Sequence, residues 1–205
     1  MIGFYNYTVI LTYLGLASSV FGIGLAMQGR TIAALLCLLF SGFCDLFDGK
    51  VARMKKDRTD EEKQFGIQID SLCDVVCFGI NPAVIGYSIG ATAWWQTAIL
   101  IAFVLCGVIR LAYFNVMEES RQRKTNEKLH SYKGLPITCS ALIVPLTMCF
   151  NKLAGAAMPT IYCVVLAITG ACYIIPFSVV KPGKRGTVIM LILGVIFTAV
   201  LLWLR

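Results

Sequence analysis

The sequence is poor in charged residues and has a single histidine. Only 14% of its 205 residues are Asp, Glu, Lys or Arg, whereas 58% are apolar. So little polar surface excludes a water-soluble domain of this size and indicates a polytopic membrane protein. The apolar stretches show no alternation of apolar and polar residues, so the spans are predicted to be helices and not strands of a barrel.

Patterns of cysteine and histidine that hold zinc are also missing. The nine cysteines include no CxxC pair, and His130 stands alone in a polar segment. These absences argue against a zinc site and predict buried, reduced thiols. The first apolar stretch lacks a basic leader and a small-residue cleavage site, so it is expected to remain as a span.

Seven apolar stretches are candidates for membrane spans. They cover residues 6–28, 31–54, 65–89, 92–116, 135–151, 157–180 and 186–204. The fifth is short and contains Pro145, so we expect about seven spans within a range of six to eight. The predicted fold is an all-α transmembrane helical bundle that forms a single domain over residues 1–205.

Basic residues gather in alternate loops. Thirteen of them lie in the second, fourth and sixth loops, at positions 53–63, 121–133 and 181–185, and three lie on the other side at Arg30, Lys152 and Arg205. The positive-inside rule then places the N-terminus and these even-numbered loops in the cytoplasm. Basic residues so close to spans are typical of contacts with lipid headgroups, and no nucleic-acid partner is expected.

Four of the eleven acidic residues lie inside apolar stretches. They are Asp45 and Asp48 in the second stretch and Asp70 and Asp74 in the third. A carboxylate at membrane depth is costly unless it is paired, binds a metal or faces water, so these residues are candidates for function. The sequence favours a metal site in a membrane enzyme or an ion pathway.

The spacing of these aspartates predicts that they meet. Asp45 and Asp48 are three residues apart and Asp70 and Asp74 four apart, so each pair shares a helix face. If the two stretches form an antiparallel hairpin, both pairs lie about 6–12 Å inside the cytoplasmic helix ends. Four carboxylates so close together need cations, and all-oxygen ligands favour Mg²⁺ or Mn²⁺, with Ca²⁺ as an alternative.

Two other interpretations of the aspartates stay open at this point. They could form buried ion pairs with Lys50 and Arg53, although two cations do not neutralise four acids. They could also line the pathway of a cation transporter, although no broken helix or inverted repeat is evident.

The acidic pattern resembles the signature of the CDP-alcohol phosphatidyltransferase family. The matching positions are Asp45-x2-Asp48-Gly49-x2-Ala52-Arg53 and Gly66-x3-Asp70-x3-Asp74. The twelve residues Met54–Phe65 between the two halves are more than the family usually has, and we expect the extra residues to lengthen the cytoplasmic turn.

Within this family, the chain is most similar to the integral-membrane phosphatidylserine synthases of bacteria and archaea. The similar segments are Ile69–Ala83, Arg110–Asn115 and Lys133–Pro136. The resemblance implies a six-helix core that transfers a phosphatidyl group from CDP-diacylglycerol to L-serine and releases CMP. The same family with another acceptor, such as glycerol phosphate or inositol phosphate, is the nearest alternative.

The resemblance also implies roles for individual residues. The metal ligands would be Asp45, Asp48, Asp70 and Asp74, around two ions of Mg²⁺ or Mn²⁺, with Asp74 also the general base. The nucleotide would lie against Gly49, Ala52, Arg53 and Gly66, with Arg53 also assisting catalysis.

Three further residues are candidates for binding serine or phosphate, namely Arg110, Asn115 and Lys133. For Arg110, the alternative is a side chain that only extends to the membrane interface. The expected partners are the substrates, the lipid bilayer and a second copy of the chain in a homodimer. The expected location is the cell membrane of a bacterium or archaeon, with the active site facing the cytoplasm.

Overall fold

Long helices run along one axis and make up nearly all of the described chain. The computed structural model describes residues 3–4, 7–55, 57, 59–124, 131–180 and 184–203. The helical elements are η1 (Tyr7–Val9), α1 (Ile10–Met27), α2 (Thr31–Met54), α3 (Asp60–Asp74), η2 (Val75–Ile80), α4 (Asn81–Ser88), α5 (Trp94–Lys124), η3 (Ile137–Cys139), α6 (Ser140–Cys149), α7 (Asn151–Ala154), η4 (Gly155–Ala157), α8 (Met158–Ile174) and α9 (Lys184–Trp203). The predicted all-α class is confirmed.

Six helical stretches of the described chain are long and apolar enough to cross a bilayer. They are Tyr7–Met27, Thr31–Ala52, Asp60–Ser88, Trp94–Glu119, Asn151–Ile174 and Gly186–Trp203. A seventh, Ile137–Cys149, is apolar but shorter. It corresponds to the fifth predicted span, and Pro145 lies inside its helix. The protein is therefore an integral membrane protein, and the predicted range of six to eight spans is confirmed.

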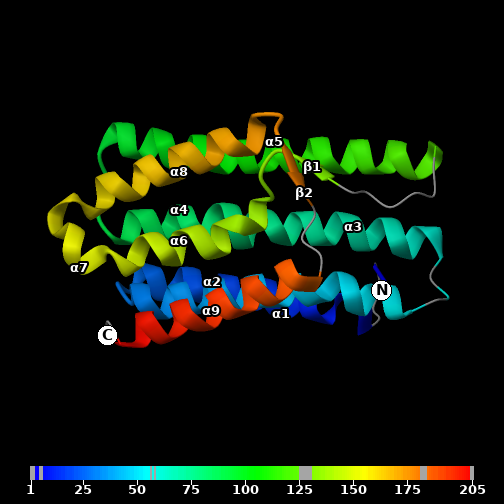
Figure 1. Cartoon of the computed structure of the whole chain (residues 1–205), viewed down its shortest axis with the longest axis horizontal. Helices are drawn as coiled ribbons and strands as arrows, with labels where there is room; N and C mark the ends of the chain where they lie inside the picture. Colours follow the sequence, from blue (N-terminus) through cyan, green and yellow to red (C-terminus); the bar gives the residue numbers. More distant parts are fainter. Residues whose placement is uncertain are drawn as a thin grey trace.

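The helices lie in three layers. Figure 1 shows α5 and α8 along one edge, α1, α2 and α9 along the opposite edge, and α3, α4 and α6 between them. The α2–α3 turn and the carboxyl end of α5 lie at one end of the bundle. The α1–α2 and α4–α5 turns and α7 lie at the other end. The loops predicted to share a side are thus placed together where the structure describes them.

A two-stranded antiparallel sheet joins the start of the sixth helix to the end of the eighth. Strand β1 (Ser131–Lys133) pairs with β2 (Ser178–Val180). Gly134 follows with a φ of 74°, and its N–H donates to the carbonyl of Phe177 over 2.8 Å. Strand β1 falls in a predicted loop and β2 at the end of the sixth predicted span, so this pairing was not predicted.

The connection between α2 and α3 is short. Helix α2 ends at Met54, and α3 begins at Asp60, where Thr59 and Glu62 form a capping box in which the Thr59 side chain accepts from the Glu62 N–H. Most of the segment between Arg53 and Gly66 is therefore helical. The reason is local, because a capping residue followed by three acids at Asp60, Glu61 and Glu62 favours a helix start.

The helix bounds correct the predicted depth of the acidic residues, chiefly on α3. Asp48 and Asp45 lie six and nine residues before Met54, the end of α2, and Asp70 and Asp74 lie ten and fourteen residues after Asp60. At 1.5 Å per residue, the first pair lies about 9–14 Å and the second about 15–21 Å from the helix ends. The predicted 6–12 Å assumed that the helices end near Arg53 and Gly66.

Helix α1 packs closely on α2 through a small residue. A Cβ atom added at Gly22 would lie 2.8 Å from the Cβ of Cys37 on α2. Small residues at such crossings allow membrane helices to approach and gain dispersion contacts. Gly24, on the same helix, has no atom within 4 Å of an added Cβ.

We expect Gly22→Ala to destabilise the protein by about 1–3 kcal/mol, because the new methyl group forces α1 from α2. Gly24→Ala is the matched control. It should be neutral or stabilising by up to about 1 kcal/mol, since Ala favours helix more than Gly. Thermal unfolding in detergent measures both variants. Equal midpoints for the two would contradict the close packing of α1 on α2.

Candidate active site

Three of the four aspartates meet between α2 and α3. Asp45, Asp70 and Asp74 each offer a carboxylate oxygen, and these oxygens all lie within 4.8 Å of one another. Asp74 is buried, and Asp45 and Asp70 are half-buried. Among the described residues this is the one group of His, Cys, Asp or Glu side chains placed to hold a metal ion.

Asp48 lies beside this group and is held from another helix. It is only 8% exposed, and its Oδ2 accepts a hydrogen bond from Thr12 Oγ1 of α1 at 3.0 Å. Thr12 and all four aspartates line one small cavity of about 10 Å³. Helix α1 thus takes part in the site, which the acidic pattern alone did not indicate.

The helix that carries Asp70 and Asp74 changes its winding directly after the second of them. Residues Val75–Ile80 form a π-helix, η2, between α3 and α4. The carbonyl of Phe78 within it accepts a hydrogen bond from Ser140 Oγ at 3.0 Å. Such π-segments often lie at functional sites. A regular apolar pattern contains no signal for this change, so the sequence predicted an ordinary helix here.

Arg110 lies inside the bundle. The side chain of this α5 residue is 7% exposed, and its Nε donates to the carbonyl of Leu135. Its guanidinium lies 5.5 Å from the ring centre of Phe114 and interacts electrostatically with Asp74. An arginine that only extended to the interface would be exposed, so the burial favours a role inside the protein.

Asn115 connects α5 to the acidic helix. It exchanges hydrogen bonds with Ser71, at 3.2 Å from the Ser71 Oγ to its Oδ1 and at 2.9 Å from its Nδ2 to that Oγ. Ser71 follows Asp70 directly, so Asn115 lies close to the carboxylate group. Its amide is engaged with Ser71 in this structure.

The remaining predicted site residues lie towards the α2–α3 turn or in β1. Gly49 and Ala52 on α2 and Gly66 on α3 are half-buried. The backbones of Arg53 and Lys133 belong to α2 and β1. The side chains of both lie outside the described part of the structure, so their predicted roles stay predictions.

Lys50 and the cysteines bear on the alternative interpretations. The Lys50 side chain is exposed, and its Nζ lies 4.7 Å from the ring centre of Phe47. An exposed Lys50 over Phe47 argues against the alternative in which Lys50 forms a buried ion pair with the aspartates. All nine cysteines are free, and four of them, including Cys73 and Cys77, are buried. The other five are half-buried, so the prediction of buried thiols is met only in part.

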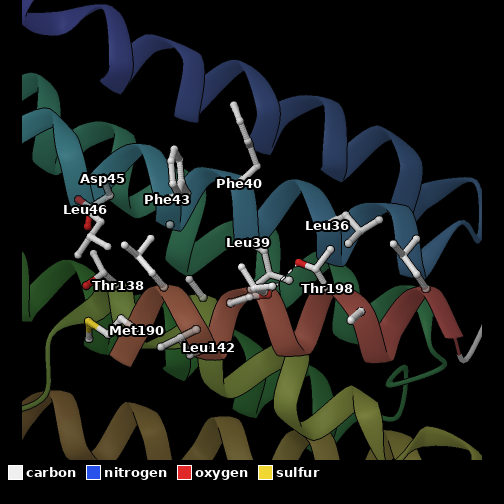
Figure 2. A pocket seen from close by; sticks show the side chains of 17 residues that line it. Leu36, Leu39, Phe40, Phe43, Asp45, Leu46, Thr138, Leu142, Met190 and Thr198 are labelled. Carbon is white, nitrogen blue, oxygen red and sulfur yellow. Dashed lines mark hydrogen bonds between the residues drawn. The ribbon is translucent and has the colours of Figure 1, made fainter. Parts of the chain in front are cut away.

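A large apolar groove ends at the acidic group. It has a volume of about 660 Å³ and lies between α2, α6 and α9. Figure 2 shows Leu39 of α2 beside Thr198 of α9, with Asp45 and Thr138 at one end of the groove. Asp45 belongs to both the groove and the carboxylate group. The apolar pattern of the separate helices did not predict this space, because it arises only where the three helices diverge.

The chemistry of the donors fits a hard divalent cation. The ligands are all carboxylate oxygens, which suit Mg²⁺ or Mn²⁺, and no thiol or imidazole joins the group. Buried acids of like charge so close together destabilise each other unless a cation offsets their charge. The group could therefore hold a divalent metal.

The match to known proteins identifies the family. The model of the CDP-alcohol phosphatidyltransferase family matches residues 5–204. The chain therefore belongs to this family, and the resemblance drawn from the aspartate pattern is confirmed.

Curated relatives carry names from one branch of the family. The CDP-diacylglycerol–serine O-phosphatidyltransferase of Saccharomyces cerevisiae is 38% identical over 114 residues, 54% of this chain and 40% of the yeast protein. The archaetidylserine synthase of Methanothermobacter thermautotrophicus is 34% identical over 152 residues, 72% of this chain and 60% of that protein. The Bacillus subtilis CDP-diacylglycerol–serine O-phosphatidyltransferase is 32% identical over 128 residues, 60% of this chain and 66% of that protein. The chain spans less than two thirds of each of these relatives.

We expect Mn²⁺ or Mg²⁺ to raise the thermal stability of the protein through the acidic group. A ligand at a hundred times its Kd stabilises the folded state by about 2.7 kcal/mol. Asp70→Asn should abolish this gain, although without metal the variant should unfold at a higher temperature because one repelling charge is gone.

The matched control is Asp60→Asn on the same helix. Asp60 is exposed and pairs with Lys63 at 2.9 Å, outside the carboxylate group. This variant should keep the full metal-dependent shift in a thermal unfolding assay. An equal shift in Asp70→Asn would place metal binding elsewhere.

Proposed function

We propose that this chain transfers the phosphatidyl group of CDP-diacylglycerol to the hydroxyl of L-serine, which yields phosphatidylserine and CMP. The observation that carries the proposal is a carboxylate group at the end of an apolar groove, in a member of the CDP-alcohol phosphatidyltransferase family. Serine is proposed as the acceptor because the names of the relatives include serine or archaetidylserine. The enzyme would be one domain over residues 1–205 and would act as a homodimer.

The groove supports a lipid-linked donor. Its lining is apolar except for Asp45, Thr138 and Thr198. A volume of about 660 Å³ lies in the range of ordinary ligand pockets. An acyl chain lying there would bring the pyrophosphate of the donor to Asp45, where the carboxylates lie.

The metal would be held by Asp45, Asp48, Asp70 and Asp74. When bound, Mg²⁺ or Mn²⁺, proposed as two ions, supplies positive charge against the pyrophosphate and the departing CMP. The aspartates then serve as ligands that keep the donor in one orientation. Gly49, Ala52 and Gly66 on the same helices leave space for the nucleotide, and Arg53 would offset its charge.

The proposed chemistry is one displacement at phosphorus. The serine hydroxyl oxygen forms a bond to the lipid-side phosphorus, and the bond from that phosphorus to the CMP oxygen breaks. Asp74 would accept the hydroxyl proton, because it is the buried member of the carboxylate group. CMP leaves with the electron pair of the broken bond.

Arg110 is the proposed anion partner for the carboxylate of serine, with Asn115 and Lys133 as neighbours in the acceptor pocket. Its burial inside the bundle and its electrostatic interaction with Asp74 support this role. An arginine fork matches a carboxylate in geometry as well as in charge.

The end of the bundle that holds the α2–α3 turn is proposed to face the cytoplasm of a bacterium or archaeon. The thirteen basic residues of the even-numbered loops support this orientation. A soluble nucleotide and serine would then reach the site from that side.

The first test follows CMP release from CDP-diacylglycerol by purified protein. We expect release to require both a divalent metal and L-serine, and Asp70→Asn to be slower by about a hundredfold or more. CMP release with glycerol phosphate or inositol phosphate, and not with serine, would change the proposed acceptor and support phosphatidyl transfer. If folded protein releases no CMP with any acceptor, and instead conducts cations in proteoliposomes, the transfer reaction is wrong.

We expect Arg110→Lys to raise the KM for serine by about tenfold to a hundredfold, because a charged hydrogen-bond pair contributes about 1.5–3 kcal/mol. The KM for CDP-diacylglycerol should change much less. Steady-state kinetics with each substrate varied in turn provides the measurement. A KM for serine equal to that of the wild type would remove Arg110 from the acceptor pocket.

A further inference from the structure

Thr12 contacts the acidic group from outside the two helices that carry the family pattern. It lies on α1 and is 9% exposed, and its Oγ1 donates to Asp48 Oδ2 at 3.0 Å across 36 residues of sequence. Asp48 itself is 8% exposed. With both side chains buried, little water is available to replace this hydrogen bond.

Other buried or half-buried threonines in the bundle use their hydroxyls differently. Thr147, Thr169 and Thr198 each donate to the carbonyl four residues earlier in their own helix, at 2.8 Å. That arrangement satisfies a hydroxyl locally in an apolar environment. Thr12 donates instead to a side chain of another helix, and that side chain belongs to the acidic site.

The contact between α1 and α2 fixes the position of Thr12. One turn further along α1, the carbonyl of Gly15 accepts a hydrogen bond from Ser41 Oγ of α2 at 2.8 Å. A Cβ added at Gly15 would lie 3.3 Å from the Cβ of Cys44. Helix α1 is therefore held against α2 close to Thr12, and the hydroxyl is presented to Asp48 by a packed interface.

Asp48 lies at the edge of the carboxylate group. The carboxylate oxygens of Asp45, Asp70 and Asp74 gather within 4.8 Å, and Asp48 lines the same cavity without belonging to that group of three. Its Oδ2 accepts from Thr12. A donor on one oxygen restricts the rotation of the carboxylate beside the other acids.

We propose that Thr12 is a positioning residue that holds Asp48 in the orientation needed to bind the divalent metal. The inference rests on the metal site of the proposed function and adds to it a helix that carries no acidic ligand. Hydrogen-bond partners of metal ligands commonly affect metal affinity or activity by about tenfold to a hundredfold.

The test measures Mn²⁺ affinity in detergent, without substrate, from the EPR signal of free Mn²⁺. Thr12→Val removes the hydroxyl while keeping the shape, and should weaken binding by about tenfold to a hundredfold. Thr12→Ser restores the hydroxyl and should recover most of the affinity. Thr169→Val is the matched control, because the Thr169 hydroxyl is buried and donates only within its own helix.

A double-mutant cycle tests whether the effect passes through Asp48. In an Asp48→Asn background, Thr12→Val should cause much less additional loss than it does in the wild type. Thermal unfolding and size-exclusion profiles identify folded variants, and Thr12→Ala replaces Thr12→Val if the latter does not fold.

Three results would overturn the proposal, and they differ from one another. If the wild type binds Mn²⁺ and Thr12→Val binds it with the same affinity, Thr12 has no positioning role, although the metal site stands. An equal loss in both backgrounds means that Thr12 does not act through Asp48. If the wild type binds no Mn²⁺, the metal site of the proposed function fails, and the role of Thr12 fails with it.

Discussion

Crowding of carboxylates inside an apolar bundle is the constraint on which the rest of this structure depends. Asp45, Asp70 and Asp74 offer oxygens within 4.8 Å of one another, in a segment where water is scarce. Like charges at that distance in a low dielectric repel strongly unless a cation lies among them. The folded bundle must therefore hold them together through contacts made elsewhere, and a divalent ion would relieve the repulsion.

The contacts that resist this repulsion come from close helix packing and polar side chains. Gly15 and Gly22 let α1 lie against α2, and Ser41 hydrogen-bonds across the same interface. On the other side, Asn115 and Ser71 join α5 to α3 next to Asp70. Small residues and interhelical hydrogen bonds are the usual means of packing helices in membranes, where lipid offers no hydrophobic driving force between them. A rigid acidic site is thus compatible with an otherwise apolar chain.

The position of the groove relates the site to the membrane. Asp45 lies at one end of an apolar space between α2, α6 and α9, while the α2–α3 turn lies at the end of the bundle that carries basic residues (Figures 1 and 2). A substrate with a lipid tail and a charged head needs an apolar and a polar environment side by side. The groove and the carboxylate group provide both at one position, and Asp45 belongs to each.

The sequence by itself determined that the spans are helices and number between six and eight, and it identified the family and the four aspartates. Hydropathy predicts membrane-spanning helices, because a helix satisfies its own backbone polar groups within the bilayer. Residue spacing predicts which side chains share a helix face. Tertiary structure alone decided the π-helix after Asp74, the β1–β2 pairing, the burial of Arg110 and the contact of Thr12 with Asp48. These features depend on which helices meet at a given depth, and that depends on packing between residues far apart in the chain, which local periodicity does not encode.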